Sequence, residues 1–229
     1  MVANPKNQFC MCPEPPEAVG QTRAAVLRPY MWPRGTTITV KFLEGDPSLT
    51  ARVAAVAQDW VGPGMANLRF QFVDTGDADI RIAFQPGRGS WSYIGTQCKG
   101  IDSAWPTMNF GWLTPGSPDD EVRRVVLHEF GHAIGLIHEH QNPNHPIEWN
   151  RDAVVADLSG PPNNWDSATI NTNMFAKYDL ASVIATPVDQ DSIMMYPIPS
   201  SWTLDGFSAG LNQGLSPQDK DLIRKVYPW

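Results

Sequence analysis

The stretch HEFGHAIGLIHEH, residues 128–140, decides how this 229-residue chain is interpreted. Four histidines and two glutamates lie within it, interleaved with Phe, Ala, Ile and Leu. The segment before it carries a strong helix start, with Ser117 as the expected N-cap, Pro118 in the first turn and acidic residues at 119–121. We therefore expect a helix over 117–135 that carries the first half of the stretch.

The spacing on this helix predicts a metal site. Positions four apart lie on one helix face, so His128 and His132 can direct two imidazoles at one ion, at ~2.0–2.1 Å for zinc. Glu129 is rotated by roughly a quarter turn of the helix from His128, so it can flank the metal without ligating it. This position suits a general base that acts on a metal-bound water. Gly135 permits the positive φ that ends a helix, and His138 then arrives from outside as a third ligand. Three protein ligands leave one position open for water, whereas structural zinc sites are usually filled by protein.

The alternative is that His128 and His132 are ordinary, partly buried helix histidines, since the short pattern H-E-x-x-H also arises by chance. The longer pattern H-E-x-x-H-x-x-G-x-x-H adds further constraints, and all five histidines of the chain lie between residues 128 and 145. These two observations favour the metal site. His140 and His145 match no ligand position, and we expect them to face solvent or to lie behind the ligands.

Residues 128–138 resemble the zinc signature of the metzincin metallopeptidases. The continuation is similar to the astacin branch, in which a glutamate, here Glu139, follows the third histidine. SIMMY, residues 192–196, resembles the astacin Met-turn, although SIMMYP alone would also fit a buried apolar turn. The resemblance implies that Met194 forms an apolar floor beneath the metal. It also implies that Tyr196 approaches the metal or stabilises the transition-state oxyanion.

A weaker resemblance covers the N-terminal half. DADIRIAF, residues 77–84, resembles the metzincin strand before the edge strand, and GSWSYIG, residues 89–95, is similar to the astacin edge segment. In the family the edge strand pairs antiparallel with extended substrate. This implies substrate contacts from Trp91, Ser92, Tyr93 and Ile94. Matrixin-like bacterial and fungal relatives share these features, and the resemblance runs from about residue 36 to 227.

The chain departs from the astacin pattern in two respects. Astacin-type domains usually carry two structural disulfides, which the three cysteines of this chain cannot form. In mature astacins the glutamate at the position of Glu139 meets the freed N-terminus, whereas about 20 extra residues precede the domain here. We therefore expect Glu139 to hydrogen-bond an internal group.

The periodicity of the remaining sequence predicts an α+β fold. Alternation indicates strands at 36–42, 67–74 and 79–84, with short strands at 90–96 and 107–112. Helical spacing indicates a helix at 48–61, with Ser48 as its N-cap, and a final helix capped by Ser216. With the resemblance, these elements imply a metzincin-type catalytic domain over 23–229. It would combine a twisted mixed sheet, an active-site helix and a loop-rich C-terminal lobe ending in a helix.

Residues 1–22 are expected to form an extended N-terminal arm, because Pro13, Pro15 and Pro16 favour extended backbone there and no periodic apolar face is present. The arm contains Cys10 and Cys12, while the third cysteine is Cys98. One hypothesis is that Cys10 or Cys12 reaches the open zinc position as a thiolate and holds the enzyme latent. The alternatives are a free thiol and a disulfide to Cys98.

Composition limits the partners. The formal net charge of −7 argues against a nucleic acid or an anionic membrane, and no apolar stretch approaches the ~20 residues of a membrane span. We expect protein or peptide substrates and a monomer. The resemblance implies that the protein acts outside the cell. Residues 1–20 show no secretory signal, so a leaderless or cytoplasmic chain is the alternative.

The sequence thus predicts a zinc-dependent endopeptidase that cleaves extended polypeptides with metal-activated water, Glu129 transferring the proton. Residues 197–202 are expected to line the pocket for the substrate residue after the scissile bond. One alternative function is a catalytically inactive, zinc-containing module that binds peptides through the same edge strand. Another is a structural zinc domain in which His140 or a cysteine closes the fourth position. Glu129 argues against the binding module, because a pure binder needs no base.

Overall fold

A computed structural model of the chain describes residues 9–10, 26–143, 147–161, 163–176, 183–184 and 186–229. Of the expected arm, 1–22, only Phe9 and Cys10 belong to these residues, so the arm as a whole lies outside the described part. Within the described part, no helix is both long enough and apolar enough to cross a membrane.

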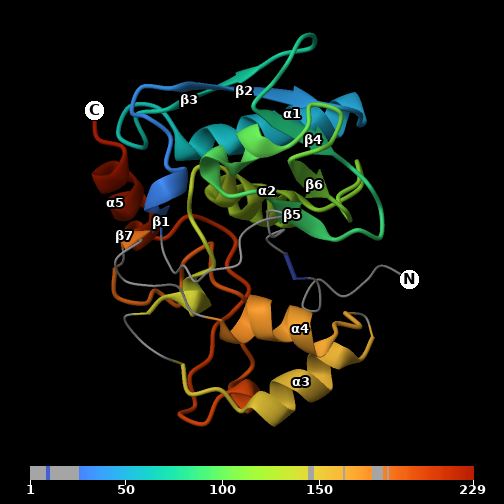
Figure 1. Ribbon diagram of the computed structural model, residues 1–229, viewed down its shortest axis with the longest axis vertical. Coiled ribbons are helices and arrows are strands. Elements are labelled where there is room, and N and C mark those ends of the chain that lie inside the picture. The colour runs from blue at the N-terminus through green and yellow to red at the C-terminus, as the bar shows by residue number, and fades with distance from the viewer. Residues whose placement is uncertain (1–8, 11–25, 144–146, 162, 177–182, 185) are drawn as a thin grey trace.

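A five-stranded mixed sheet organises the N-terminal half (Figure 1). Its strand order is β3-β2-β4-β6-β5, in which the first four strands are parallel and β5 runs antiparallel to β6 at the edge. The strands are β2 (Thr37–Phe42), β3 (Arg69–Phe72), β4 (Ile80–Ala83), β5 (Ser90–Ser92) and β6 (Met108–Phe110). The predicted strands and the α+β class are confirmed.

The edge strand is shorter than predicted, because β5 ends at Ser92 and a 3₁₀ segment, η4 (Gly95–Gly100), follows. Gly95 explains the change of direction. Its φ is +49°, and a β-carbon there would lie against the carbonyl of Tyr30. Only glycine fits this close approach, and it takes the chain out of the extended conformation.

Two helices of the N-terminal half pack against each other, α1 (Pro47–Ala57) and α2 (Asp119–Ala133) (Figure 1). Both helices were predicted, but both predicted N-caps are wrong. Asp46 caps α1 and accepts a hydrogen bond from the backbone N–H of Ser48 at 2.8 Å. The Ser117 hydroxyl accepts from the N–H of Thr114 instead, and α2 starts without a side-chain cap.

The C-terminal half has little regular structure, as predicted. Its helices are α3 (Arg151–Ser159), α4 (Ser167–Ile170) with a π-helical turn, η6 (Asn171–Phe175), and the final α5 (Pro217–Val226). In Figure 1, α3 and α4 lie at the end of the molecule opposite the sheet. A two-stranded ladder joins β1 (Val26–Leu27) to β7 (Val183–Ile184). The remaining short 3₁₀ segments are η2 (Arg28–Tyr30), η3 (Gln58–Trp60), η5 (Glu139–Gln141) and η8 (Ser200–Trp202).

Two large apolar clusters stabilise the two halves. One fills the space around the sheet, α1, α2 and α5, and it includes Trp60, Phe130 and Met194. The other lies among α3, α4 and the segment after Met194, and it includes Tyr196 and Trp202. Because Met194 belongs to the first cluster and Tyr196 to the second, the turn that carries them connects the two halves beside α2.

Candidate metal centre and active site

Three buried histidines converge at the end of α2. His128 and His132 lie one turn apart on the helix, and His138 follows the helix end; the ligand atoms of the three lie within 4.8 Å of one another. The Nε2 atoms of His132 and His138 are 3.2 Å apart. Tetrahedral zinc with bonds of ~2.0–2.1 Å separates its ligand nitrogens by roughly 3.3 Å. The spacing of these imidazoles therefore suits zinc.

Backbone carbonyls orient two of the three imidazoles. Nδ1 of His128 lies 2.8 Å from the carbonyl oxygen of Ile193, and Nδ1 of His132 lies 2.9 Å from that of Leu136. A carbonyl only accepts, so Nδ1 carries the proton and Nε2 keeps its lone pair for a metal. Nε2 of His128 is buried and has no hydrogen-bond partner among the described residues, which is the arrangement expected of an atom that binds a metal.

Burial also keeps these rings neutral. It lowers the pKa of His128 and His138 well below the usual range, and that of His132 to about 4. Desolvation is the main cause, because the charged imidazolium loses its hydration. Neutral imidazole is the form that binds a metal, so the site favours the ligand state of all three residues.

A glycine exit brings His138 back to the helix. Gly135 has φ +104°. Its N–H donates to the carbonyl of His132 at 2.8 Å, and the N–H of Leu136 donates to the carbonyl of Gly131 at 2.9 Å. These bonds satisfy carbonyls at the end of α2 while the chain reverses. The positive φ predicted for Gly135 is confirmed.

Glu129 is fully buried beside the histidines but is not one of the three clustered ligands. Its carboxylate oxygens accept no hydrogen bond from a nitrogen or oxygen donor of the described residues. Burial raises the pKa of Glu129 to about 8. The cause is desolvation, because the charged carboxylate loses its hydration.

The segment Phe9–Cys10 lies over this site. The pKa of the buried Cys10 thiol is raised well above its usual range, first by desolvation and then by the charge of Glu129. The hydroxyl of Tyr196 donates a hydrogen bond to the Cys10 carbonyl. Cys10 and Cys98 are both free thiols, so the expected alternative of a Cys10–Cys98 disulfide is wrong; Cys12 lies outside the described residues.

Tyr196 and His140 stack against the histidine cluster. The ring centroid of Tyr196 is 4.3 Å from that of His138. It is 4.5 Å from the centroid of His140, and the planes of the Tyr196 and His140 rings meet at 30°. Nε2 of His140 is 2.7 Å from the carbonyl oxygen of Asn173. His140 is therefore buried behind the ligands, which is the second of the two placements expected for it. His145 lies outside the described residues.

Met194 and Glu139 are joined through the backbone. Met194 is fully buried, its sulfur faces Gly131 of α2, and its carbonyl accepts from the N–H of Glu139 at 2.9 Å. The Glu139 carboxylate accepts from Nδ2 of Asn142 at 2.8 Å and from the N–H of Asp189 at 3.2 Å. Glu139 thus hydrogen-bonds internal groups, as expected, and burial raises its pKa to about 8.

The edge-strand residues face different surroundings. Trp91 and Tyr93 are partly exposed, and their rings meet edge to face at 5.9 Å. Ser92 is buried, and Ile94 packs in a small separate apolar cluster with Leu27, Ile137 and Val183. The side chain of Ile94 is therefore committed to the core. Its backbone N–H donates to Oε1 of Gln97 at 3.0 Å, and its carbonyl accepts from the N–H of Gln97 at 3.1 Å.

Sequence reasoning missed Asp219. This buried residue of α5 accepts hydrogen bonds from the Ser192 hydroxyl at 2.6 Å and from the N–H of Ile193 at 2.9 Å. It thereby holds the turn whose Ile193 carbonyl orients His128. No local sequence signal links Asp219 to a turn more than twenty residues earlier, because the contact arises only when α5 packs against that turn.

Comparison with known proteins identifies the family. Residues 65–227 match the family model of astacin, a peptidase family. The chain belongs to the astacin family. It is accordingly a zinc-dependent metalloendopeptidase, and the predictions of family, fold, enzyme class and zinc are confirmed. The astacin branch, rather than a matrixin-like relative, is the one that matches.

Solved structures agree with this assignment. One structure of myroilysin superposes on the astacin-family chain with a TM-score of 0.87 and 44% identity, covering 90% of this chain and 98% of that one. A second myroilysin crystal structure gives a TM-score of 0.72 and 38% identity, and the match covers 100% of this chain and 94% of the myroilysin chain. High choriolytic enzyme 1, a hatching enzyme zinc-protease from the medaka fish Oryzias latipes, shares the fold at 19% identity and a TM-score of 0.54, covering 87% and 94%. No curated protein sequence matches the chain.

Proposed function

We propose that His128, His132 and His138 hold the catalytic zinc of this endopeptidase and that Glu129 is its general base. The supporting observation is the convergence of three buried, neutral imidazoles beside the buried Glu129 carboxylate, which accepts no hydrogen bond from a nitrogen or oxygen donor in the described part of the chain. A structural zinc domain would need a fourth protein ligand. His140 is outside the ligand cluster, and its Nε2 meets the Asn173 carbonyl, so it does not take that role.

Zinc, when bound, supplies Lewis-acid activation of water and of the scissile carbonyl. Glu129 accepts the proton of the attacking water and returns it to the leaving amine. The Tyr196 hydroxyl donates to the carbonyl oxygen of the substrate, as it does to the Cys10 carbonyl. Met194 supports the site from below as the apolar floor of a Met-turn. The backbone of Trp91, Ser92 and Tyr93 pairs with the extended substrate at the free edge of β5, and Ile94 anchors the end of this segment in the core.

Substitution of Glu129 by Gln tests the assignment. The amide has nearly the same shape but cannot accept the proton, so casein hydrolysis should fall by about 10²–10⁴-fold while zinc content stays at one ion per chain. Glu148→Gln is the matched control, because Glu148 is exposed. Substantial hydrolysis by Glu129→Gln would remove this residue from the role of base.

Chelation distinguishes the catalytic from the structural alternative. The expected result is that a chelator abolishes casein hydrolysis while the chain stays folded, and that added zinc restores the activity. A chain that unfolds on chelation and shows no hydrolysis beforehand would support the structural zinc domain. Stoichiometric zinc without hydrolysis under any condition would support the peptide-binding module.

We also propose that the N-terminal arm, 1–22, holds the enzyme latent through Cys10, with the catalytic domain spanning 23–229. The support is that Cys10 is buried, its carbonyl is bound by Tyr196 and its thiol lies beside Glu129. A thiolate is a strong zinc ligand, so a metal in the site would favour its deprotonation. Substrate could not contact Tyr196 and Glu129 while Cys10 occupies this place.

The latency proposal is tested by comparing casein hydrolysis of the intact chain, a chain without residues 1–20, and Cys10→Ala. The shortened chain and Cys10→Ala should be faster than the intact chain, while Cys98→Ala, which changes a buried thiol elsewhere, should not. Equal rates for the intact and shortened chains would eliminate the latency function.

We further propose that the enzyme acts outside the cell as a monomer. The support for extracellular action is the astacin-family resemblance, and the support for a monomer is that the proposed site draws all its residues from one chain. Sedimentation at working concentration and fractionation of the producing cells test the two statements. A dimer, or activity confined to the cytoplasm, would contradict them.

A further inference from the structure

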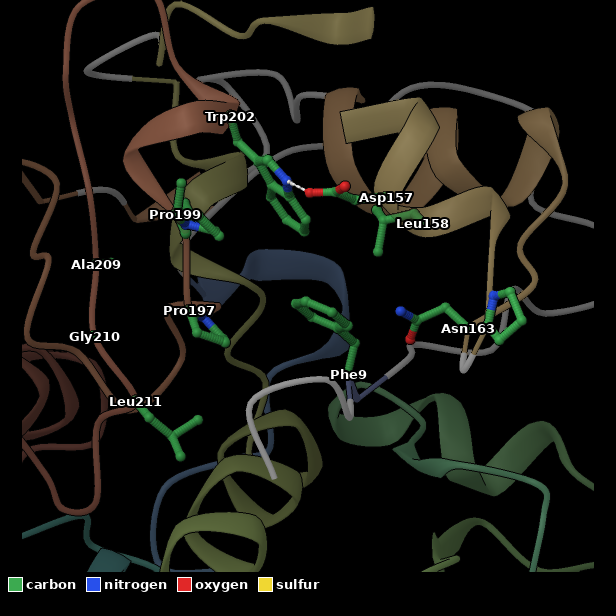
Figure 2. A pocket seen from close by; sticks show the side chains of 12 residues that line it. Phe9, Asp157, Leu158, Asn163, Pro197, Pro199, Trp202, Ala209, Gly210 and Leu211 are labelled. Carbon is green, nitrogen blue, oxygen red and sulfur yellow. Dashed lines mark hydrogen bonds between the residues drawn. The ribbon is translucent and has the colours of Figure 1, made fainter. Parts of the chain in front are cut away.

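Phe9 forms one wall of a pocket beside the proposed catalytic site (Figure 2). Its ring is almost fully buried. It stacks on the ring of Trp202, with the centroids 5.9 Å apart and the planes at 24°, and its centroid is 5.2 Å from that of Tyr196. Trp165 lies against it at 5.9 Å. Three aromatic partners around one ring form a specific binding site for a planar apolar side chain, since tilted and stacked rings attract each other beyond simple burial.

The pocket extends beyond Phe9 and is mainly apolar. Its volume is about 610 Å³, within the ~300–1,000 Å³ usual for ligand pockets. Leu158, Pro197, Ile198 and Leu211 contribute to its lining. Figure 2 shows the Phe9 ring in the middle of these side chains, facing Trp202 and Leu158.

Charge in the pocket has one sign. Asp157 is the charged residue among the described lining residues, and none of them is Lys, Arg or His. The Asp157 carboxylate accepts a hydrogen bond from Nε1 of Trp202 at 2.6 Å, so it is already paired. An acidic substrate side chain would lose hydration here, find no cation and meet the negative charge of Asp157, which is unfavourable.

The pocket is one residue away from the reacting groups. Cys10, directly after Phe9, has its carbonyl bound by Tyr196 and its thiol beside Glu129. Neighbouring Cα atoms are about 3.8 Å apart, so a residue next to a scissile bond at Tyr196 and Glu129 would place its side chain in the space that Phe9 uses. The pocket walls include Pro197, Ile198, Pro199 and Trp202, from the segment expected to receive the residue after the scissile bond.

From these contacts and from the expected place of residues 197–202 we infer that this pocket selects an aromatic or large aliphatic side chain immediately after the scissile bond. Phe9 precedes Cys10, so it takes the place of that side chain with the chain running in the direction opposite to substrate. The inference rests on the proposed function and adds the substrate class. Preferred substrates are polypeptides with Phe, Leu or a similar residue at that position. Acidic residues there are rejected.

The test uses the full chain, unaltered and with Phe9→Ala, each loaded with zinc. Mass spectrometry of casein digests locates the cleaved bonds, and fluorogenic peptides that differ only after the cleaved bond, with Phe, Leu, Ala or Asp, give kcat/KM. Phe and Leu peptides should exceed the Ala peptide by at least about 10-fold, and the Asp peptide should be slowest. Phe9→Ala should cleave the Phe peptide faster than the unaltered chain, because the pocket is open.

A charge substitution provides the control on the pocket itself. Leu211→Arg places a cation at the partly exposed pocket wall. It should raise kcat/KM for the Asp peptide, relative to kcat/KM for the Phe peptide, about 10-fold or more. Leu204→Arg is the control, because Leu204 is exposed and lies outside the pocket, and it should leave this ratio unchanged. Cleavage without preference for Phe or Leu, a preference for Asp, or selection only before the bond would overturn the inference. No hydrolysis of casein or of any peptide, by these chains or by the chain without residues 1–20, would instead refute the proposed function.

Discussion

Gly131, inside the zinc-binding stretch, lies directly against the sulfur of Met194, far later in the chain. A β-carbon on Gly131 would lie 2.5 Å from Met194 Sδ and 3.2 Å from a ring carbon of Trp60. Both neighbours are fully buried, so neither side chain can move without disturbing its own packing. The absence of a side chain at this helix position therefore lets the turn at 192–195 approach α2.

Gly131→Ala should destabilise the fold. Overpacking costs about 1–3 kcal/mol, which exceeds the ~1 kcal/mol that alanine adds to a helix relative to glycine. Denaturant unfolding measures the difference. Gly100→Ala is the control, because a β-carbon there meets no atom within 4 Å. A Gly131→Ala chain as stable as the original would show that Met194 moves aside freely.

Asp219→Ala should destabilise the chain by about 2–4 kcal/mol, because Ser192 Oγ and the N–H groups of Ile193 and Ser216 lose a buried acceptor. Zinc affinity should also fall, since the Ile193 carbonyl orients His128. The measurements are denaturant unfolding and zinc titration.

Asp221→Ala on the same helix is the matched control. Its carboxylate is exposed and pairs only with Arg224 at 3.0 Å among the described residues, so the loss should stay within about 0.5 kcal/mol. Equal effects of the two substitutions would show that α5 depends on acidic residues in general and that Asp219 does not specifically hold the turn.

His140 is expected to position Tyr196 and His138 without touching substrate. His140→Ala removes the stacked ring and should lower kcat roughly 10-fold with a smaller change in KM, because a small displacement of a catalytic group costs rate more than binding. His140→Phe keeps a ring but loses the contact with the Asn173 carbonyl, and it should recover part of the rate. Thermal unfolding shows whether each variant is folded; a change confined to KM would contradict the positioning role.

Cys98 should contribute to stability in a pH-dependent way. Burial raises its pKa to about 12, whereas the thiol in an unfolded chain ionises near 9. Since the folded pKa is the higher one, this contribution is complete below pH 9 and is lost as pH rises from 9 to 12. The unfolding free energy of the original chain should therefore fall more steeply over this window than that of Cys98→Ala. Parallel slopes for the two chains would show that the thiol is not shielded.

Most of the fold could be predicted from local patterns. The strands around the sheet follow from alternation, and the i, i+4 pair His128 and His132 must share a face once a helix forms. Gly135 has the positive φ that its place in the pattern requires. The start of α5 at Ser216 was predicted correctly, whereas the starts of α1 and α2 were not. For α1, Asp46 and Ser48 are both good caps, and only the path of the loop decides between them.

The sequence by itself determined the helix, the histidine spacing and the family resemblance, because these depend on backbone geometry over a few residues. Only the tertiary structure decided which distant groups complete the site: the Ile193 carbonyl on His128, Asp219 behind that turn, His140 buried against Tyr196, and Phe9 in the pocket at Trp202. The physical reason is that burial and hydrogen bonding between residues far apart in sequence arise only when the two halves pack together. No periodicity along the chain encodes those contacts.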